Sequence, residues 1–336
     1  MKIGIKAIEY YLPDAVITND DLASIYEEWT PEKILEKTGI QQRHISGANE
    51  TAADMACFAA EKLFQEHNID RTDIDFVILA TQSPDYYLPT SACLLQHRLG
   101  LSQKVGAIDF NLGCSAYIYG LAMAKSLIFS GVARNVLLLM AETYTKYIHP
   151  MDKTNRTIFG DGAAATLICA GEDVAEIGMF DLGTNGNGAE HLIVPAGGAR
   201  TPRNQASGAA EVDDTGSVRS KDNLFMSGAD VFNFTIEVVP KTVNEILQKE
   251  KLKQEDINLF VFHQANKFML DYLRKKIKIE KEKFYINLTD TGNTVSATIP
   301  IALKRAQEDG RLNKGDKVML VGFGVGLSWG STILTW

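Results

Sequence analysis

The feature that most constrains the fold is the stretch of residues 105–131, VGAIDFNLGCSAYIYGLAMAKSLIFSG. A β-prone run leads through a short turn and Cys114 into a helix that we expect to end at Gly131. Lys125 is the only ionisable side chain of that helix apart from its tyrosines. A helix that is apolar on nearly all sides is normally buried in a large domain. We therefore expect the chain to fold around this helix.

Cys114 falls at the first turn of the expected helix. Unpaired N–H groups and the helix dipole stabilise negative charge at that position. A thiol placed there tends toward the thiolate, which is the nucleophilic form. The position therefore predicts a catalytic nucleophile. The alternative is an inert buried cysteine, which is the commoner fate of a free cysteine.

Length and composition exclude several classes of protein. A chain of 336 residues is long enough for two domains or one large α/β unit. The net charge of −8 argues against general nucleic-acid binding. No run approaches the roughly 18 apolar residues of a membrane span, and residues 1–20 do not resemble a signal peptide. The four cysteines form no CxxC pair, which favours reduced thiols in the cytoplasm over a disulfide framework or a zinc site.

Strand-like and helix-like segments alternate twice along the chain. Residues 1–171 and residues 172–336 each follow the order strand, helix, strand, helix, strand, helix, strand, strand (βαβαβαββ). Short strands that alternate with helices predict mainly parallel sheets with right-handed crossovers. The sequence therefore predicts an α/β protein of two similar halves joined near residue 171.

Three side chains with catalytic chemistry fall at matching places in this repeat. Cys114 and Asn293 follow corresponding strands, and His263 follows the preceding strand of the second half. α/β folds place their sites beyond the carboxyl ends of parallel strands. We therefore expect these three side chains to share one site.

Two glycine motifs and one basic segment need separate interpretation. GFGVG, at 322–326, is followed by a strand where a phosphate loop needs a helix, so we reject nucleotide binding there. FGDG, at 159–162, is interpreted as a structural turn. The segment 264–278 is expected to form a basic helix, which is either a solvated face or a docking surface for an anionic partner.

Taken together, these stretches resemble the β-ketoacyl-acyl-carrier-protein synthase III (3-oxoacyl-ACP synthase III) family of the thiolase-like superfamily. The matching motifs appear in family order over essentially the whole chain: TGIQQRHI at 38–45, Gly113-Cys114-Ser115, FGDGAAA, HQAN, GNT and GFGVGLSWG. The resemblance implies a thiolase-like fold with five layers, α/β/α/β/α, and a homodimer. It also implies that Cys114, His263 and Asn293 are the catalytic residues.

The reaction implied by the resemblance has two halves. An acyl group passes from acyl-CoA to Cys114, and malonyl-acyl carrier protein then undergoes decarboxylative Claisen condensation to a β-ketoacyl thioester. His263 and Asn293 would donate hydrogen bonds to the enolate oxygen, and no metal or redox cofactor would take part. The pathway would be fatty acid synthesis or related acyl or polyketide synthesis.

The resemblance further implies a set of binding residues. The oxyanion would be held by the backbone N–H groups of Cys114 and Val325. The substrate and coenzyme A would be bound by Trp29, Lys153, Asn266 and Leu88. The carrier protein would dock on Lys267, Arg274, Lys275 and Lys276.

The sequence departs from the family pattern at several of these positions. Lys153 stands where the family has an arginine, Val325 replaces a glycine, and Phe268 replaces an arginine found in many members. Thiolases have a second cysteine in the C-terminal half, elongating synthases have a histidine in place of Asn293, and plant-type polyketide synthases are usually longer. The alternatives are a Cys-His-Asn acyltransferase or thioester hydrolase of the same fold, and a non-catalytic binding member.

Overall fold

The computed structural model describes residues 1–336, and the alternating strands and helices expected from the sequence are present in both halves. The N-terminal half contains β1 (Ile3–Tyr11), β2 (Val16–Thr18), α1 (Asn19–Ile25), α2 (Pro31–Thr38), β3 (Gln42–His44), α3 (Ala52–Glu66), β4 (Phe76–Ala80), α4 (Ser91–Arg98), β5 (Gly106–Phe110), α5 (Ala116–Phe129), β6 (Asn135–Glu142) and β7 (Gly162–Ala170).

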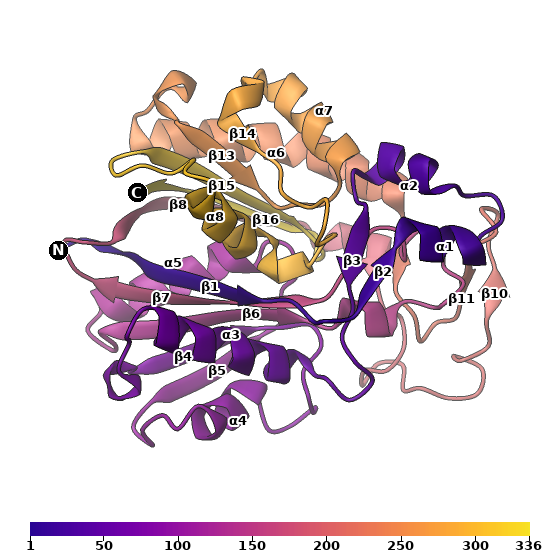
Figure 1. Ribbon diagram of the computed structural model, residues 1–336, viewed down its shortest axis with the longest axis horizontal. Helices are drawn as coiled ribbons and strands as arrows, with labels where there is room; N and C mark the ends of the chain where they lie inside the picture. The colour runs from indigo at the N-terminus through magenta and orange to yellow at the C-terminus, as the bar shows by residue number, and fades with distance from the viewer.

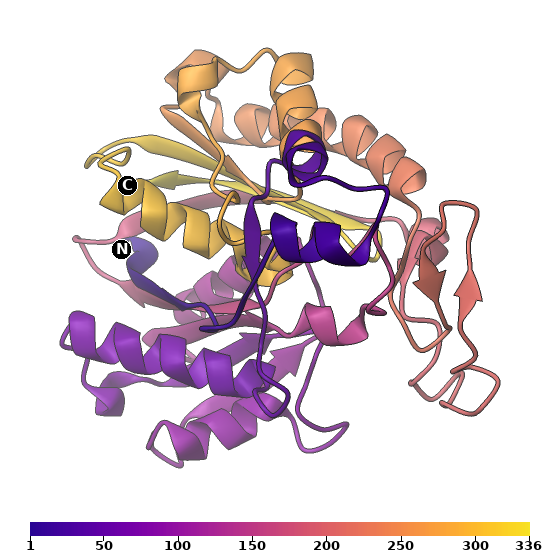
Figure 2. The same cartoon turned by 45° about the vertical axis from the view of Figure 1, so that its right-hand side comes forward.

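The C-terminal half repeats this pattern after a long loop. It contains β8 (Ala175–Thr184), α6 (Gly228–Glu250), β13 (Leu259–Phe262), α7 (Lys267–Ile277), β14 (Phe284–Tyr285), α8 (Thr298–Glu308), β15 (Lys317–Gly324) and β16 (Ser328–Thr335). The loop between β8 and α6 carries four short strands: β9 (Leu192–Ile193), β10 (Glu211–Val212), β11 (Val218–Arg219) and β12 (Phe225–Met226). Figure 1 shows α1, α2, β10 and β11 at the same end of the molecule, and in Figure 2 the β10–β11 hairpin projects from its right-hand side.

The main strands form one 10-stranded sheet in the order β14-β13-β15-β16-β8-β1-β7-β6-β4-β5. The two halves of this sheet have equivalent strand orders: β1-β7-β6-β4-β5 in the N-terminal half and β8-β16-β15-β13-β14 in the C-terminal half. In each half three strands pair in parallel, and the last strand pairs antiparallel on both of its sides. The expectation of mainly parallel sheets is therefore wrong, because the last strand of each half, β7 or β16, runs antiparallel to both of its neighbours.

Helices pack on both sides of each half of the sheet and create three large cores. One core joins α3 and α4 to the N-terminal strands, and another joins α6 and α7 to the C-terminal strands. The third core contains α5 and α8, which lie between the two halves of the sheet (Figure 1). This arrangement is the expected five-layered α/β/α/β/α fold. The division into domains at residue 171 stays a prediction, and that residue lies between the end of β7 and the start of β8.

The apolar helix predicted from the sequence is α5, and it is a central element of the fold. Gly131 follows its last turn with a φ of 76°, a left-handed conformation that ends helices and favours glycine. Strand β6, beside it, is buried on both faces: Leu138 and Met140 contact the α5 core, whereas Leu137 and Leu139 contact the α3 core. The nucleophile candidate before α5 is thus anchored by the most deeply buried part of the chain.

Candidate active site

Cys114 lies directly before Ser115, the N-cap residue of α5, and its side chain is buried. The end of β15 passes against it. A β-carbon built on Gly324 would lie 2.8 Å from the Cys114 Cβ and 3.0 Å from its Sγ. One built on Gly322 would lie 2.9 Å from the Cys114 carbonyl oxygen. The glycines of GFGVG therefore allow a strand of the C-terminal half to contact the cysteine. This close packing accounts for the glycines, so no phosphate-binding role is needed.

His263 directly follows β13 and is buried. Its Nδ1 lies 2.8 Å from the Oγ1 of Thr298, the first residue of α8. The ring also packs edge-on against Phe323, with 5.4 Å between the ring centroids. Two neighbouring elements therefore fix both the tilt of the imidazole and the partner of one of its nitrogens.

Asn293 is held by the FGDG segment of the other half. Its backbone N–H donates to the Ile158 carbonyl at 2.9 Å, and its carbonyl accepts from the Gly160 N–H at 3.0 Å. The side-chain Oδ1 accepts from the Val295 N–H at 2.9 Å. This bond orients the amide and leaves the Nδ2 group as a free donor. The FGDG segment is not a regular turn: Phe159 forms an isolated β-bridge with Asn293 and Gly162 begins β7, so the segment has a structural role beside Asn293.

Shared neighbours bring the three side chains around one point. Phe323 contacts the His263 ring, and the next residue in the strand, Gly324, contacts Cys114. Val295, whose backbone is bonded to the Asn293 side chain, belongs to the same small apolar cluster as Cys114. The site is therefore built where loops of both halves meet.

Burial sets the protonation states of the cysteine and the histidine. Desolvation raises the pKa of the Cys114 thiol, the nearby Glu142 carboxyl raises it further, and the backbone N–H of Cys114 lowers it. Desolvation lowers the pKa of His263 to about 3. The resting site consequently holds a neutral thiol and a neutral imidazole. The expected resting thiolate is wrong, because the helix start lies in an apolar core where burial outweighs the local N–H groups.

Two backbone N–H groups at the site are available as donors. Neither Cys114 nor Val325 donates its N–H to a backbone carbonyl or to a side chain. Val325 lies beside the nucleophile loop, since a β-carbon on Gly113 would lie 2.7 Å from its Cγ1. Val325 therefore lies beside the segment that carries Cys114, and no other residue accepts the N–H of either.

Trp29 and Lys153, predicted to bind coenzyme A, are linked through the residue before Trp29. Lys153 is largely buried and forms an ion pair with Glu28 at 2.6 Å. The ammonium groups of Lys33 and Lys37 lie 5.3 and 4.8 Å from the Trp29 ring centroid. The structure therefore brings an aromatic ring and three cations together, with one carboxylate competing for Lys153.

The other predicted binding residues differ in their surroundings. Asn266 caps α7, and its side chain accepts from the Met269 N–H at 2.9 Å. Leu88 is 82% exposed on a loop that projects from the chain, so it does not line this chain's own site. The structure thus gives Asn266 a structural bond and leaves Leu88 free for another surface.

The four basic residues assigned to carrier-protein docking are not equivalent. Lys267 pairs with Asp271 at 2.5 Å, and Arg274 donates to the Ile279 carbonyl at the end of α7. Lys275 and Lys276 are exposed and form no ion pair. Near the start of the same helix Phe268, which replaces an arginine of the family, is 63% exposed and packs against Phe232, which in turn packs against Tyr272. This patch of two free cations and three aromatic rings was not predicted as a unit.

Sequence reasoning missed two residues next to the site. Thr298 bonds His263, and Glu142 is a fully buried carboxyl near Cys114. Glu142 is the only charged residue of its strand and follows seven residues of which six are apolar, a signal that could have marked it. Thr298 gave no comparable signal, because a threonine at a helix start is ordinary.

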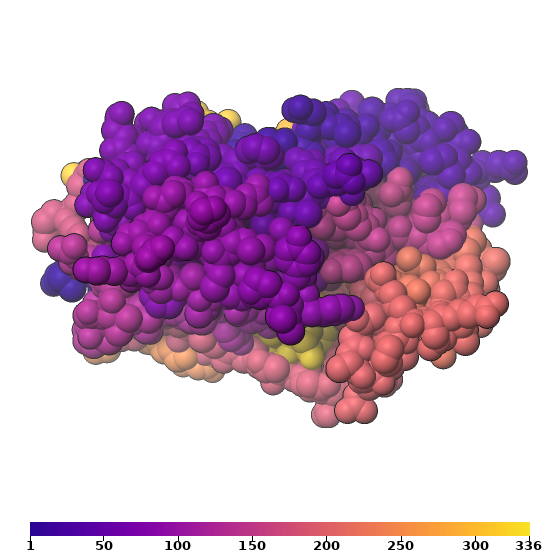
Figure 3. All heavy atoms as spheres, turned by 90° about the horizontal axis from the view of Figure 1, so that it is seen from below, coloured from indigo at the N-terminus to yellow at the C-terminus, as the bar shows by residue number.

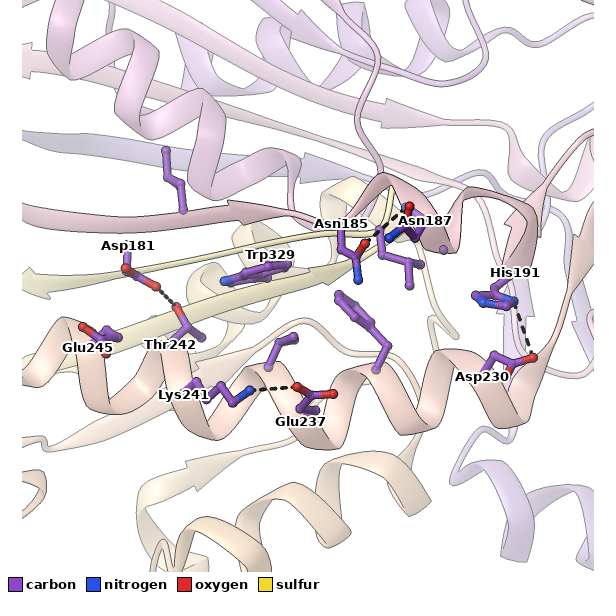
Figure 4. A pocket seen from close by; sticks show the side chains of 15 residues that line it. Asp181, Asn185, Asn187, His191, Asp230, Glu237, Lys241, Thr242, Glu245 and Trp329 are labelled. Atoms are coloured by element: carbon purple, nitrogen blue, oxygen red, sulfur yellow. Dashed lines mark hydrogen bonds and ion pairs between the residues drawn. The ribbon is translucent and has the colours of Figure 1, made fainter.

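A cavity of about 560 Å³ lies elsewhere, between α6, β16 and the loop after β8 (Figure 4). None of the three catalytic candidates lines it. Its polar side chains pair with one another: Lys241 with Glu237, His191 with Asp230, and Thr242 with Asp181. Figure 3 shows another face, where yellow C-terminal atoms lie at the floor of a hollow between purple and salmon segments.

Two features are absent from the structure. No group of three or more histidine, cysteine, aspartate or glutamate side chains is arranged to hold a metal ion. None of the helices is both long and apolar enough to cross a membrane.

The fold and the site together define a thiolase-like enzyme with a buried cysteine directly before a central helix. Residues 108–186 match the family model for 3-oxoacyl-[acyl-carrier-protein (ACP)] synthase III, and residues 247–336 match the model for its C-terminal part. The β-ketoacyl-[acyl-carrier-protein] synthase III of Fusobacterium nucleatum is 38% identical over 99% of this chain and 98% of its own length. The chain therefore belongs to the 3-oxoacyl-ACP synthase III family, and the predicted type of enzyme, an acyltransferase, is confirmed.

Solved structures agree with this assignment. A crystal structure titled 3-oxoacyl-(acyl-carrier-protein) synthase III is 50% identical and superposes with a TM-score of 0.98, each chain being covered completely. The 3-oxoacyl-(acyl-carrier protein) synthase of Burkholderia xenovorans LB400 is 33% identical, with a TM-score of 0.91 over 99% of this chain and 94% of that one. The priming β-ketosynthase of the R1128 polyketide pathway is 27% identical, with a TM-score of 0.84 over 99% and 96%.

Proposed function

We propose that this protein is a 3-oxoacyl-ACP synthase III that transfers an acyl group from acyl-CoA to Cys114 and condenses it with malonyl-acyl carrier protein. The observation that carries this function is that a buried thiol, a neutral imidazole and a free amide N–H share the neighbouring residues Phe323, Gly324 and Val295. Neutral donors suit a reaction whose second half forms an enolate, because an enolate oxygen is stabilised by hydrogen bonds.

The first half-reaction uses Cys114 as the nucleophile. Its sulfur attacks the thioester carbonyl, and the N–H groups of Cys114 and Val325 stabilise the oxyanion. The C–S bond to coenzyme A then breaks. The thiol of Cys114 becomes an acyl thioester and coenzyme A leaves as a thiol, so the proton lost by the enzyme is balanced by the proton gained by the leaving group.

The second half-reaction uses His263 and Asn293 as donors. Malonyl-acyl carrier protein loses CO₂, and the electron pair of the broken C–C bond forms an enolate whose oxygen accepts from His263 Nε2–H and Asn293 Nδ2–H. The enolate carbon attacks the acyl group on Cys114 and displaces the sulfur. A β-ketoacyl thioester leaves, and the sulfur takes up one proton to restore the thiol.

Thr298 supplies the tautomer that this step requires. The Thr298 hydroxyl lies 2.8 Å from His263 Nδ1 and 3.0 Å from the Val295 carbonyl, which also accepts the backbone N–H of Thr298. In the proposed reaction the hydroxyl gives its one hydrogen to Nδ1 in place of the Val295 carbonyl. A neutral imidazole that accepts at Nδ1 carries its proton at Nε2. Thr298 is therefore a positioning residue that makes His263 a donor toward the substrate.

Partners follow from the surfaces around the site. Trp29 and Lys153 would bind the nucleotide part of coenzyme A, and the patch formed by Lys275, Lys276 and Phe268 would dock an acidic carrier protein. A homodimer is supported by the unpaired outer edge of β5 and by the exposed loop that carries Leu88. Four free cysteines favour the cytoplasm, and no step requires a metal or redox cofactor.

Separate measurement of the two half-reactions tests this function. Radiolabelled acylation and CO₂ release should be followed in parallel on Cys114→Ala, His263→Ala and Asn293→Ala. Cys114→Ala should lose acylation and retain decarboxylation. The other two variants should still acylate Cys114, but their CO₂ release should fall by about 10²–10³-fold, the usual loss for one such donor.

The product distinguishes the alternatives. A β-keto thioester with stoichiometric CO₂ supports condensation, whereas release of the free acid would indicate a thioester hydrolase. Absence of acyl-Cys114 in the wild-type protein would indicate a non-catalytic member of the fold. If His263→Ala lost acylation as completely as Cys114→Ala, the histidine would be an obligatory base and the roles assigned above would be wrong.

A further inference from the structure

We propose that Glu142 is a positioning residue that acts as an uncharged acid, tying the Asn293 loop to the loop after β4 without placing a negative charge beside the reaction centre. This role rests on the proposed condensation. It concerns the only buried glutamate next to Cys114, a group that neither half-reaction uses directly.

The carboxyl of Glu142 joins the two halves of the molecule. Its Oε1 accepts from the Ser296 hydroxyl at 3.1 Å, and Ser296 lies three residues after Asn293. Its Oε2 accepts from the Gln82 N–H at 3.0 Å and lies 3.2 Å from the Ser83 hydroxyl. A single side chain at the end of β6 thus connects the segment that carries Asn293 with the loop that follows β4.

All the partners of Glu142 are neutral. No lysine, arginine or histidine forms an ion pair with it, and the side chain is fully buried. A buried carboxylate without a cation is costly, and such a group remains protonated instead. Desolvation accordingly raises the pKa of Glu142 from 4.5 to about 8. A protonated carboxyl can donate to a serine hydroxyl, because a hydroxyl both accepts and donates.

Ionisation of Glu142 would oppose both half-reactions. The carboxylate would raise the pKa of the Cys114 thiol further and would repel the negative charge that develops on the enolate and on the malonyl carboxylate. The uncharged form keeps the hydrogen bonds to both loops and adds no repulsion. The buried Glu142 side chain therefore supports the reaction only while its carboxyl group is protonated.

The other titratable groups around Glu142 are Cys114, Tyr144, Tyr147 and Asp161. Burial raises the pKa of Cys114 and of Tyr144, and it raises the pKa of Tyr147 to about 12. The pKa of Asp161 is also raised, but its carboxylate accepts from the N–H and hydroxyl groups of both Ser46 and Thr145. Because Asp161 is also an acid, it must be tested as a control.

The pH profile of CO₂ release, measured from about pH 6 to about pH 10, tests this role. If only the protonated form is active, the wild-type rate should fall about tenfold per pH unit above the pKa of Glu142. Glu142→Gln preserves size and stays neutral, so its rate should be constant over the same range. Ser296→Ala removes a bond that lowers the pKa of Glu142, so its alkaline fall should begin at higher pH.

Asp161→Asn is the matched control and should retain the wild-type alkaline fall. An unchanged fall in Glu142→Gln, or its disappearance in Asp161→Asn alone, would overturn the assignment. A Ser296→Ala pH profile that coincides with the wild-type profile would also overturn the assignment. These outcomes are read from the shape of the profile, which a purely structural contribution of Glu142 would not alter.

Thermal unfolding provides a readout that does not depend on activity. The pKa of Glu142 is raised in the folded protein, so its contribution to stability is complete below pH 4.5 and is lost as pH rises toward about 8. The Tm of wild type should therefore fall relative to that of Glu142→Gln over this interval. Parallel Tm curves would refute the buried acid, whereas a protein with divergent curves but no condensing activity would refute only the proposed function.

Discussion

At the scale of single residues, the site depends on neutral groups placed by burial. Burial disfavours the charged forms of both Cys114 and His263. The Thr298 hydroxyl lies 2.8 Å from His263 Nδ1, and we propose that it selects the nitrogen that the imidazole presents to the substrate. Glu28 has the opposite character, because it is a solvent-exposed anion that holds Lys153. Substitution of Thr298 and substitution of Glu28 each give a prediction at the residue scale.

Replacing Thr298 by valine should slow CO₂ release and leave acylation of Cys114 close to wild type. Valine has the same shape but cannot donate to Nδ1, so the proton of a neutral His263 is no longer directed to Nε2. A loss of about 10-fold or more is expected, somewhat below the cost of deleting a donor outright. Thr298→Ser keeps the hydroxyl and should restore the rate. Equal losses in both variants would show that the hydroxyl is not the cause.

Replacing Glu28 by glutamine should lower the KM for acyl-CoA. The 2.6 Å ion pair with Glu28 occupies the cation that would bind an anionic phosphate, and the carboxylate repels that phosphate. Acyl-pantetheine lacks the nucleotide, so its KM should not change. Lys153→Met is the converse variant and should raise the KM for acyl-CoA alone. A similar change for both substrates would place the nucleotide elsewhere.

At the scale of elements, α7 combines two tasks along one short helix. Its buried side packs into the C-terminal core with Met269 and Leu273, and its Asn266 cap fixes the chain just after His263. Its outer side exposes Lys275 and Lys276 beside Phe268. One side of the helix thus holds the segment after His263, and the other exposes the cations that we propose to dock the carrier protein.

Charge reversal of both Lys275 and Lys276 to glutamate should raise the apparent KM for malonyl-acyl carrier protein and leave the acyl-CoA half-reaction nearly unchanged. Exposed charges act mainly on association, so added salt should reproduce the effect on wild type. A variant with Lys251 and Lys314 reversed carries the same change in net charge on other exposed positions and serves as the control. Identical kinetics for the two double variants would exclude α7 as the docking surface.

At the scale of the whole molecule, the 10-stranded sheet ends in the unpaired edge strand β5. Strand β5, like the short β14 at the opposite end, has a neighbour on one side only, and its Ile108 is 39% exposed. The loop that carries Tyr87 and Leu88 projects on the same half, with Leu88 82% exposed. An unpaired strand edge with apolar side chains favours pairing with a second copy.

The protein should therefore be a homodimer in solution. Light scattering at micromolar concentration should give twice the mass of 37.0 kDa. Ile108→Lys places a charge on the β5 edge and should shift the protein toward the monomer, whereas Ile25→Lys changes an exposed isoleucine on α1 and should not. A wild-type monomer would contradict the dimer. It would also contradict substrate binding by Leu88, because this residue does not line the site of its own chain.

The sequence alone determined the order of the elements, the buried helix and the motifs that identify the family, because these depend on local pattern and short-range turns. It could not decide the protonation states. A helix start attracts negative charge, but only the packed core shows that burial raises the pKa of Cys114. Nor could it find Glu142, Thr298 or the pairing of Lys153 with Glu28, which join residues 154, 35 and 125 positions apart along the chain. Such contacts are set by how the two halves pack, so the tertiary structure decided them.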